Sequence, residues 1–490
     1  MPHDWGQAMS MTSYPVLGDR FALRQSGSEL RYLMNYQTGE YYELEPPQLA
    51  ALRLADGTRT IGEIASAIDV SPEDTDAFMQ AQCQDGVVAI FDCRQDRHPP
   101  YYRYSEPPHF SDVLIEVTGF CNLRCLHCFN SELNTKQAVK EQMSIAQLLK
   151  LIAELDDQNV RRIQISGGEP LSRKDIWQII DAIDRHRMFL DVISTNATVI
   201  NERMARRLSR RFSKNGALYI SMDGLSADTY EALRGKGVFP KFERAMKRLD
   251  AHGCRVFINT MAVRTNLRQM DEMYDWMANH PSVKGWRIGL PKVLGRYRDH
   301  HGELEVEFEE IIHIFKRLLK RWLNDRPGFR IELSDFFRTD SFDSGLDDHQ
   351  PDDHPCKYAL TNMTIKPNGT AVFCASLESY APAVLGNVVT QGVAKVWHGD
   401  RHMAIRQAKI RDLPECGPCR YARICGGGCR SNALLSYADI QARDPRACAA
   451  MQMLEAEIVP ELPPEFQEQF LGLIDLDRPF VPASGFRRYI

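Results

Sequence analysis

The stretch "GFCNLRCLHCFNS", residues 119–131, decides how the rest of the chain is interpreted. Its three cysteines, Cys121, Cys125 and Cys128, are separated by three residues and then by two. A structural zinc site usually takes four ligands in two pairs, and a disulfide takes two cysteines. Three thiols in one short loop therefore suggest a metal site in which one coordination position stays open.

Length, charge and cysteine usage limit the classes of protein. A chain of 490 residues suggests about three domains. A net charge of −5 gives no general reason to expect nucleic acid or an anionic membrane as partner. The N-terminus lacks the basic region and apolar run of a secretory signal, and no apolar stretch is long enough to span a bilayer. We therefore expect a cytoplasmic protein, in which thirteen cysteines are not a disulfide framework. Ten of them fall into two patterned groups, which indicates metal binding or catalysis.

Residues 12–95 are predicted to form a small separate domain. An apolar run at 29–36, a turn at Gly39 and a second run at 40–44 indicate a β-hairpin. Helices are expected over 46–57, 60–68 and 71–86, followed by a strand over 87–91. A hairpin with three helices is the outline of a winged helix.

A winged helix most often binds DNA, but the charge of this region argues against that function. It holds six arginines, no lysine and thirteen acidic residues, a net charge of −7. A duplex-binding module needs a basic face to neutralise phosphates. Peptide binding by strand addition at the hairpin edge is the alternative, beside a purely structural role. The proline-rich residues 96–112 are expected to be a linker.

Residues 113–300 alternate short apolar runs with helical patterns, which predicts an α/β fold with a parallel sheet. Six strands of a partial (β/α)6 TIM barrel would carry the chemistry on the loops at their carboxyl ends. Strands are expected at 113–118, 161–166, 189–194, 218–223, 255–263 and 285–290, with helices at 144–158, 173–186, 201–212 and 267–280.

Three further regions follow the predicted barrel. Residues 301–339 contain a long amphipathic helix that would bridge to the next domain. Residues 340–450 are rich in Gly, Pro, Asp and Cys, and residues 451–490 form a tail without an interpretable motif. The basic residues of the bridging helix and of 206–214 are interpreted as solvated faces.

Short polar motifs end the second, third and fourth predicted strands: "ISGGEP", "STN" and "SMDG". Two adjacent glycines let the backbone approach a ligand closely. Together with the three-cysteine spacing, these motifs resemble the radical S-adenosylmethionine (SAM) superfamily. The resemblance implies a 4Fe–4S cluster on Cys121, Cys125 and Cys128, whose open iron binds SAM and cleaves it reductively to a 5′-deoxyadenosyl radical. It also implies a set of SAM-binding residues: His127, Gly167, Gly168, Glu169, Ser194, Asn196, Ser221 and Arg234.

The second cysteine group contains Cys356, Cys374, Cys416, Cys419, Cys425, Cys429 and Cys448. Cysteines spaced two apart also build zinc ribbons, so zinc is the competing reading on chemistry alone. The spacings resemble the SPASM domain, in which Cys416, Cys419, Cys425 and Cys448 would hold one auxiliary cluster and Cys356, Cys374 and Cys429 the other. The implied total is three 4Fe–4S clusters. The stretch before Cys356 contains no eighth cysteine. Either Asp352, Asp353 or His354 would take its place as ligand, or one iron would stay open. The alternative for this stretch is a solvated acidic loop without a role in the site.

The combined pattern resembles radical SAM/SPASM peptide maturases that carry an N-terminal RiPP recognition element for the leader peptide. The resemblance implies an enzyme that forms thioether crosslinks from Cys sulfur to carbon, as sactisynthases and the quinohemoprotein amine dehydrogenase maturase do. The substrate would be a Cys-containing peptide or small protein, with flavodoxin or ferredoxin as electron donor. Sulfatase maturases have an aspartate as base where this chain has Ala375. The open alternatives are carbon–carbon crosslinking, epimerisation or oxidation of a peptide, and an iron–sulfur winged-helix sensor.

Overall fold

The computed structural model describes residues 10–130, 134–333, 337–377 and 380–480. The chain divides into two compact units. The N-terminal unit comprises residues 1–112, 149–163 and 178–191, and the main unit comprises residues 113–148, 164–177 and 192–490. The last ten residues of the tail expected over 451–490, and Ser131 of the cysteine loop, lie outside the described residues.

The N-terminal unit contains the predicted hairpin and the three predicted helices. Strands β3 (Leu30–Asn35) and β4 (Tyr41–Glu43) pair antiparallel, and Gly39 in their turn has a φ of 78°, which favours glycine. The other elements here are β1 (Tyr14–Leu17), β2 (Phe21–Ser26), α1 (Pro46–Leu54), α2 (Ile61–Ile68), α3 (Pro72–Gln84), β5 (Val88–Phe91) and β6 (Tyr102–Ser105). Helices α2 and α3 each begin with an N-cap side chain. Thr60 accepts a hydrogen bond from the Glu63 amide, and Ser71 accepts one from the Asp74 amide.

Strand β6 lies within the expected linker of residues 96–112. It pairs parallel with β2, so the sheet of this unit has the order β4-β3-β2-β6. The segment reads "YRYS", and tyrosine favours strands, which explains why a proline-flanked stretch still joins the sheet.

A buried charged cluster lies in the same unit. Arg24 of β2 and Asp156 of α5 (Ile145–Asp157) are both fully buried, and Arg24 Nη2 lies 3.1 Å from Asp156 Oδ1. Oδ2 of Asp156 lies 2.8 Å from Arg103 Nε and 3.1 Å from His186 Nδ1, and it accepts a hydrogen bond from Tyr101. A buried charge is tolerated only when it is paired, and this cluster meets that condition.

The main sheet has eleven strands in the order β14-β13-β12-β11-β10-β9-β8-β7-β15-β16-β17. The six predicted strands are β7 (Asp112–Glu116), β8 (Arg162–Ser166), β9 (Phe189–Thr195), β10 (Ala217–Ser221), β11 (Val256–Met261) and β12 (Val283–Gly289). The pairs from β9 to β12 are parallel, as expected for a partial barrel. A strand that was not predicted, β13 (Arg330–Leu333), continues the parallel series beyond β12, and β14 (Phe337–Arg338) follows it antiparallel.

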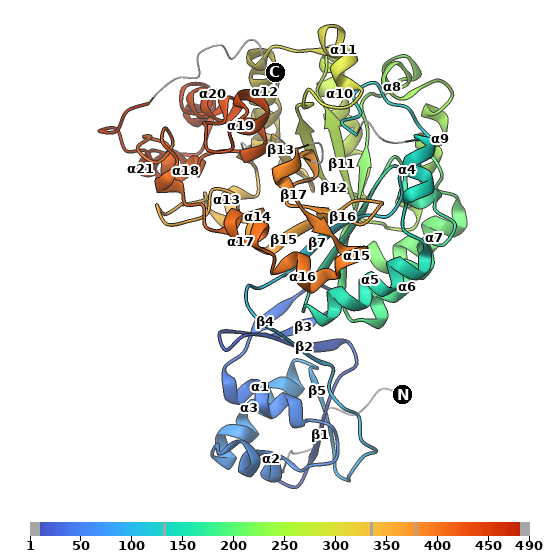
Figure 1. Cartoon of the computed structure of the whole chain (residues 1–490), viewed down its shortest axis with the longest axis vertical. Coiled ribbons are helices and arrows are strands. Elements are labelled where there is room, and N and C mark those ends of the chain that lie inside the picture. The colour runs from blue at the N-terminus through green and yellow to red at the C-terminus, as the bar shows by residue number, and fades with distance from the viewer. Residues whose placement is uncertain (1–9, 131–133, 334–336, 378–379, 481–490) are drawn as a thin grey trace. The chain divides into compact units, whose positions relative to one another are not determined.

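Helices cover the outer side of this sheet (Figure 1). Two of them, α8 (Ala227–Arg234) and α9 (Phe239–Ala251), lie in a stretch where no helix was predicted. The predicted bridging helix is α12 (Phe308–Asp325). The remaining helices up to this point are α4 (Lys136–Glu141), α6 (Ile176–Arg185), α7 (Glu202–Phe212), α10 (Met270–Ala278) and α11 (Tyr297–Leu304).

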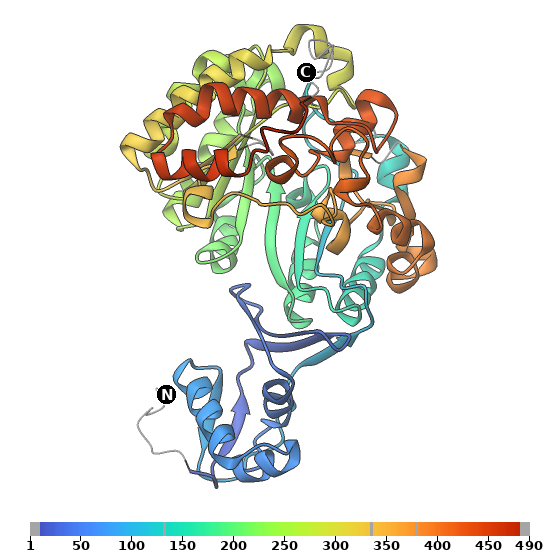
Figure 2. The ribbon, with the colours of Figure 1, turned by 90° about the vertical axis from the view of Figure 1, so that its left-hand side faces the viewer.

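The cysteine-rich region adds strands to the same sheet. Strand β15 (Asn362–Ile365) is the neighbour of β7, and β16 (Thr370–Val372) and β17 (Val384–Asn387) extend the edge antiparallel. Beside this junction Lys366 Nζ lies 2.7 Å from Glu116 Oε1, and both side chains are buried. The helices of this region are α13 (Ser341–Ser344), α14 (Lys357–Thr361), α15 (Val388–Gln391), α16 (Val393–Trp397), α17 (Asp400–Arg406), α18 (Ala422–Cys425), α19 (Arg430–Tyr437), α20 (Pro445–Met453) and α21 (Pro464–Gly472). Figure 2 draws the last of them in red, in front of the sheet.

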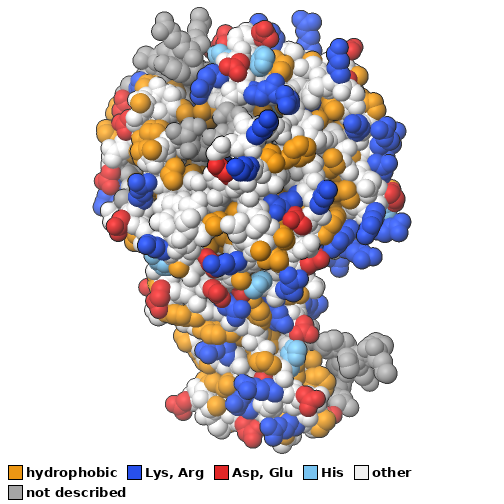
Figure 3. Space-filling view, turned by 45° about the vertical axis from the view of Figure 1, so that its right-hand side comes forward, with side chains coloured by type: hydrophobic (Ala, Val, Ile, Leu, Met, Phe, Trp, Pro, Cys, Tyr) orange, Lys and Arg blue, Asp and Glu red, His pale blue; other side chains and the backbone are white. Residues whose placement is uncertain are grey.

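On the face shown in Figure 3, Lys and Arg side chains are interspersed with Asp and Glu. Among the basic residues at 206–214, Arg206, Arg210 and Lys214 are exposed, as predicted for a solvated face, whereas Arg207 and Arg211 are half-buried. No helix among the described residues has the length and apolar character needed to cross a membrane.

Candidate functional site

The three-cysteine loop follows β7 and packs against the glycine pair that follows β8. The amide of Gly168 donates to Thr118 O at 2.9 Å, and that of Glu169 donates to Phe120 O at 2.8 Å. A Cβ atom on Gly168 would lie 2.2 Å from Phe120 O, and one on Gly167 would lie 2.6 Å from Thr118 O. Glycine is therefore required at both positions because the two loops touch backbone to backbone.

The thiols of this loop are half-buried, and two of them have hydrogen-bond donors close by. Cys121 Sγ accepts from the Leu123 amide at 3.4 Å, and Cys125 Sγ lies 3.8 Å from Arg234 Nη1. Burial raises the pKa of Cys121 to about 12 and raises those of Cys125 and Cys128. Reactive nucleophilic cysteines need a lowered pKa, whereas a bound metal deprotonates thiols directly. The loop therefore suits metal ligation better than nucleophilic catalysis.

Asp223, which sequence reasoning did not select, organises the residues around this loop. It is fully buried at the end of β10, and its Oδ2 lies 2.5 Å from Arg234 Nη2 and 3.1 Å from His127 Nε2. Burial alone would raise the pKa of Asp223, but Arg234 and His127 hold it well below its usual range. The carboxylate thus fixes two predicted SAM-binding side chains. The signal in the sequence was the motif "SMDG" itself, of which only the serine was chosen.

Glu169 joins the second and third strand ends. Its Oε1 accepts from Thr195 Oγ1 at 2.7 Å and its Oε2 from the Asn196 amide at 2.7 Å. Burial raises the pKa of Glu169 to about 7, although the hydrogen bonds that it accepts favour the charged form and lower the pKa. Asn196 Nδ2 in turn lies 3.9 Å from Cys121 Sγ.

The two predicted serines lie at the ends of neighbouring strands. Ser194 of β9 and Ser221 of β10 are half-buried, and the strand register pairs Ser194 with Tyr219. The contacts above join most of the residues predicted for the SAM site to the three-cysteine loop: His127, Gly167, Gly168, Glu169, Asn196 and Arg234. Ser194 and Ser221 lie at the carboxyl ends of β9 and β10, and their place in the SAM site stays a prediction.

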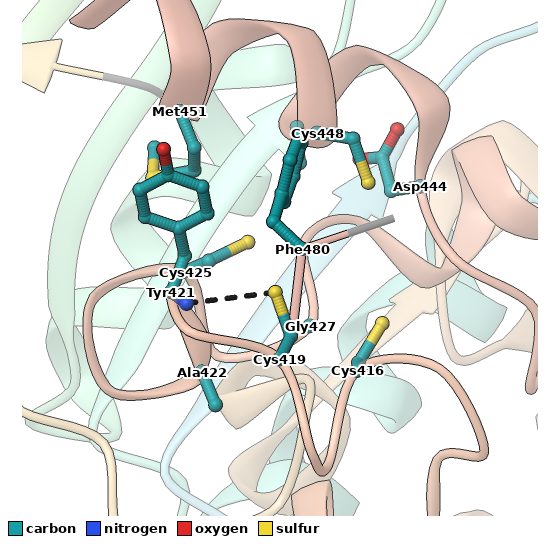
Figure 4. A pocket seen from close by; sticks show the side chains of 11 residues that line it. Cys416, Cys419, Tyr421, Ala422, Cys425, Gly427, Asp444, Cys448, Met451 and Phe480 are labelled. Atoms are coloured by element: carbon teal, nitrogen blue, oxygen red, sulfur yellow. Dashed lines mark hydrogen bonds between the residues drawn. The ribbon is translucent and has the colours of Figure 1, made fainter. Parts of the chain in front are cut away.

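Four cysteines of the second group line one cavity. Figure 4 shows Cys416, Cys419, Cys425 and Cys448 around it, together with Asp444. Burial raises the pKa of Cys416 to about 11 and that of Cys448 to about 12. Within the described residues, no three Cys, His, Asp or Glu side chains stand close enough to share a single metal ion. The four thiols surround a cavity, and this arrangement fits a cluster of several irons held by thiolates.

The other three cysteines lie near one another. Burial raises the pKa of Cys356 to about 11, and the neighbouring Cys374 and Cys429 add to the shift. The expected replacements for an eighth cysteine are engaged elsewhere. Asp352 lies 2.8 Å from Lys409 and 2.6 Å from Arg411.

Asp353 and His354 are also engaged with other groups. Asp353 Oδ2 accepts from the Gln350 amide at 3.0 Å. Both ring nitrogens of His354 face backbone groups, with Nδ1 2.8 Å from Cys356 O and Nε2 2.8 Å from Ile405 O. Whether one of these three side chains or an open position completes the site of Cys356 stays a prediction.

Comparisons with known proteins agree with this geometry. Residues 115–277 match the family model of the radical SAM superfamily, and residues 356–420 match that of the SPASM iron–sulfur cluster-binding domain. The mycofactocin maturase MftC of Mycolicibacterium smegmatis is 28% identical over 334 residues, which cover 67% of this chain and 80% of that protein. The AdoMet-dependent heme synthase of Nitratidesulfovibrio vulgaris is 26% identical over 71% of this chain and 95% of that protein.

The fold is also similar to a solved structure, that of Streptococcus suis SuiB bound to its precursor peptide SuiA. The match has a TM-score of 0.65 at 15% identity and covers 89% of this chain and 99% of SuiB. A likeness at this identity concerns the fold, and it agrees with an α/β core followed by a cysteine-rich extension. The chain thus carries one region that is similar to the radical SAM superfamily, followed by a region that is similar to the SPASM iron–sulfur cluster-binding domain.

Proposed function

We propose that this chain modifies a ribosomally made peptide or a small protein subunit by forming thioether crosslinks from Cys sulfur to carbon. The observation that carries the proposal is that one unit holds both a loop with three thiols and a separate cavity lined by four cysteines. The relative named as a mycofactocin maturase and the fold likeness to SuiB support a peptide substrate. The relative named as a heme synthase makes a non-peptide substrate the second candidate.

A 4Fe–4S cluster with SAM, when bound, would supply a 5′-deoxyadenosyl radical that removes hydrogen from an unactivated carbon. Cys121, Cys125 and Cys128 would hold this cluster. The backbone carbonyl oxygens of the glycine pair would accept from the amino group of SAM, and Asp223 would orient Arg234 toward the cofactor. Burial of this network excludes water from a reactive site.

The second cysteine group would hold two auxiliary clusters, one on the four cysteines of the cavity and one on Cys356, Cys374 and Cys429. Formation of one thioether transfers a hydrogen atom from carbon to the deoxyadenosyl group and releases the thiol proton to water. One electron would be left over, and a cluster held by Cys356, Cys374 and Cys429 would supply an acceptor for it. The product therefore weighs two hydrogens less per crosslink.

The acidic N-terminal domain of residues 12–95 would bind the leader of the substrate, with residues 96–112 connecting it to the catalytic core. A fold match over 89% of the chain extends into this region, because residues 113–490 alone make up a smaller share. Flavodoxin or ferredoxin in the cytoplasm would supply the electron for SAM cleavage.

SAM cleavage without substrate provides the first test. Replacing Cys121, Cys125 and Cys128 together by alanine should abolish 5′-deoxyadenosine formation with dithionite, while the absorbance of the auxiliary clusters remains. Cys93→Ala is the matched control, since Cys93 is exposed and belongs to neither group. Undiminished cleavage in the triple variant would place the SAM site elsewhere.

The bond type is tested on a Cys-containing peptide by mass and thiol alkylation. A loss of two hydrogens with one alkylatable thiol fewer is expected. Hydrogen loss with every thiol still free would favour carbon–carbon coupling, and an unchanged mass would favour epimerisation.

A further inference from the structure

The loop that follows β12, residues 291–296, touches both cysteine groups. At its carboxyl end, the Arg296 amide donates to Cys128 O at 2.9 Å. A Cβ atom on Gly295, whose φ is 55°, would lie 2.3 Å from Phe129 O and 2.5 Å from Cys128 O. This end of the loop is therefore packed tightly on the three-cysteine loop.

The amino end of the same loop is held by the cysteine-rich region. Arg446 of α20 is buried, and its Nη2 donates to Pro291 O at 2.8 Å. The next residue, Lys292, is half-buried, and its Nζ lies 3.7 Å from Cys429 Sγ. Lys292 also donates to Ser431 Oγ, which lies 3.0 Å from the same sulfur.

The backbone of Cys429 is fixed as well. The buried carboxylate of Asp444 accepts a hydrogen bond from the Cys429 amide at 2.8 Å. The sulfur of Cys429 is therefore held in place beside an ammonium group and a hydroxyl group. Because a hydrogen bond from a charged donor is roughly twice as strong as a neutral one, Lys292 is the stronger of the two donors.

Hydrogen bonds and net charge around the sulfurs set the reduction potential of an iron–sulfur cluster. A positive charge next to a thiolate ligand favours the reduced cluster, which carries one more negative charge. A cluster that must accept an electron during crosslinking needs this bias.

We propose that Lys292 is a positioning residue that, directly and through Ser431, raises the reduction potential of the auxiliary cluster on Cys356, Cys374 and Cys429. This inference rests on the proposed function, because it requires that cluster. It assigns a role in the cysteine-rich region to a residue at the end of a barrel strand.

The test is a redox titration, followed by electron paramagnetic resonance, of the anaerobically reconstituted full chain. In Lys292→Met the midpoint potential of this cluster should fall by about 59 mV, a tenfold change in the one-electron equilibrium constant. Iron content should stay at the wild-type value, and Lys292→Arg should keep most of the potential. Lys284→Met is the matched control, because Lys284 is half-buried on β12 and donates to no cysteine among the described residues.

An unchanged potential in Lys292→Met with full iron content would overturn the inference. Loss of iron from this variant alone would also overturn it, since Lys292 would then be needed for assembly of the cluster. Failure of the proposed function looks different: the wild type and the triple variant Cys356→Ala, Cys374→Ala, Cys429→Ala would bind the same amount of iron.

Discussion

Replacing Asp223 by asparagine removes a negative charge that a buried guanidinium and a buried imidazole share. The carboxylate is fully buried and lies 2.5 Å from Arg234 and 3.1 Å from His127. Asparagine keeps an oxygen for the Met261 amide, which now donates to Asp223 Oδ1 at 2.9 Å. The variant therefore loses the charge pairing and leaves the local backbone hydrogen bond in place.

The size of the effect follows from the burial of the pair. Removing one partner of a buried ion pair costs about 3–5 kcal/mol. Arg234 keeps the Cys125 sulfur at 3.8 Å and the Tyr230 ring at 5.6 Å, so the lower end of that range applies. We expect Arg234 to lose this much of its stabilisation in the position from which it would contact SAM. At about 1.4 kcal/mol per tenfold, the same loss in the transition state lowers the rate of SAM cleavage about a hundredfold.

The assay is 5′-deoxyadenosine formation with dithionite and SAM, without peptide. Asp228→Asn is the control, because Asp228 belongs to the next helix and is exposed. Iron content and thermal unfolding are measured in parallel. Cleavage in Asp223→Asn within about threefold of the wild type, less than 1 kcal/mol, would refute the reasoning.

The remaining predictions concern the N-terminal unit and the clusters. Arg24→Met leaves Asp156 with a buried unpaired oxygen, which destabilises residues 149–163 by about 3 kcal/mol and should speed their hydrogen exchange. Arg94→Met is the control, because Arg94 is exposed, and it should leave these exchange rates unchanged. Burial alone would raise the pKa of Asp156, but hydrogen bonding and the Arg24 charge lower it, so its contribution to stability is present above about pH 4 and lost as the pH falls. Asp156→Asn should remove this acid dependence in a pH–stability profile. Reconstituted protein should contain about twelve irons, and Cys416→Ala about four fewer.

Each of these predictions has a result that contradicts it. Wild-type exchange rates in Arg24→Met would show that the buried pair is not needed for local stability. If stability falls with pH in Asp156→Asn as it does in the wild type, other carboxylates cause the pH dependence of stability. About four irons with stoichiometric zinc would mean that the second cysteine group is a zinc site.

The strands and most helices of the core could be predicted because the apolar pattern of each one is visible within its own residues. The apolar residues at β7 to β12 form short segments that contain Val and Ile and are bounded by polar residues, which is the pattern expected of strands. Helix α8 was missed because its eight residues are mostly polar, with Tyr230 and Leu233 buried beside Arg234.

Partnerships between distant segments could not be predicted. Strand β15 was not predicted, and nothing in its own four residues indicates that its neighbour is β7. The role of Asp223 depends on its meeting Arg234 and His127, which come from a helix and from the cysteine loop. Lys292 appeared in the sequence as one lysine among many, and only its contact with Cys429 distinguishes it.

The pairing of β7 with β15 has a consequence for synthesis of the protein on the ribosome. Glu116 at the end of β7 and Lys366 next to β15 form an ion pair, and about 250 residues of sequence separate them. At 5–20 residues per second, the nascent chain carries β7 with one edge unpaired for on the order of 10–50 s before β15 emerges. An unpaired strand edge is a template for aggregation. We therefore expect this protein to depend on chaperones during translation, and fragments that end before residue 360 to be insoluble.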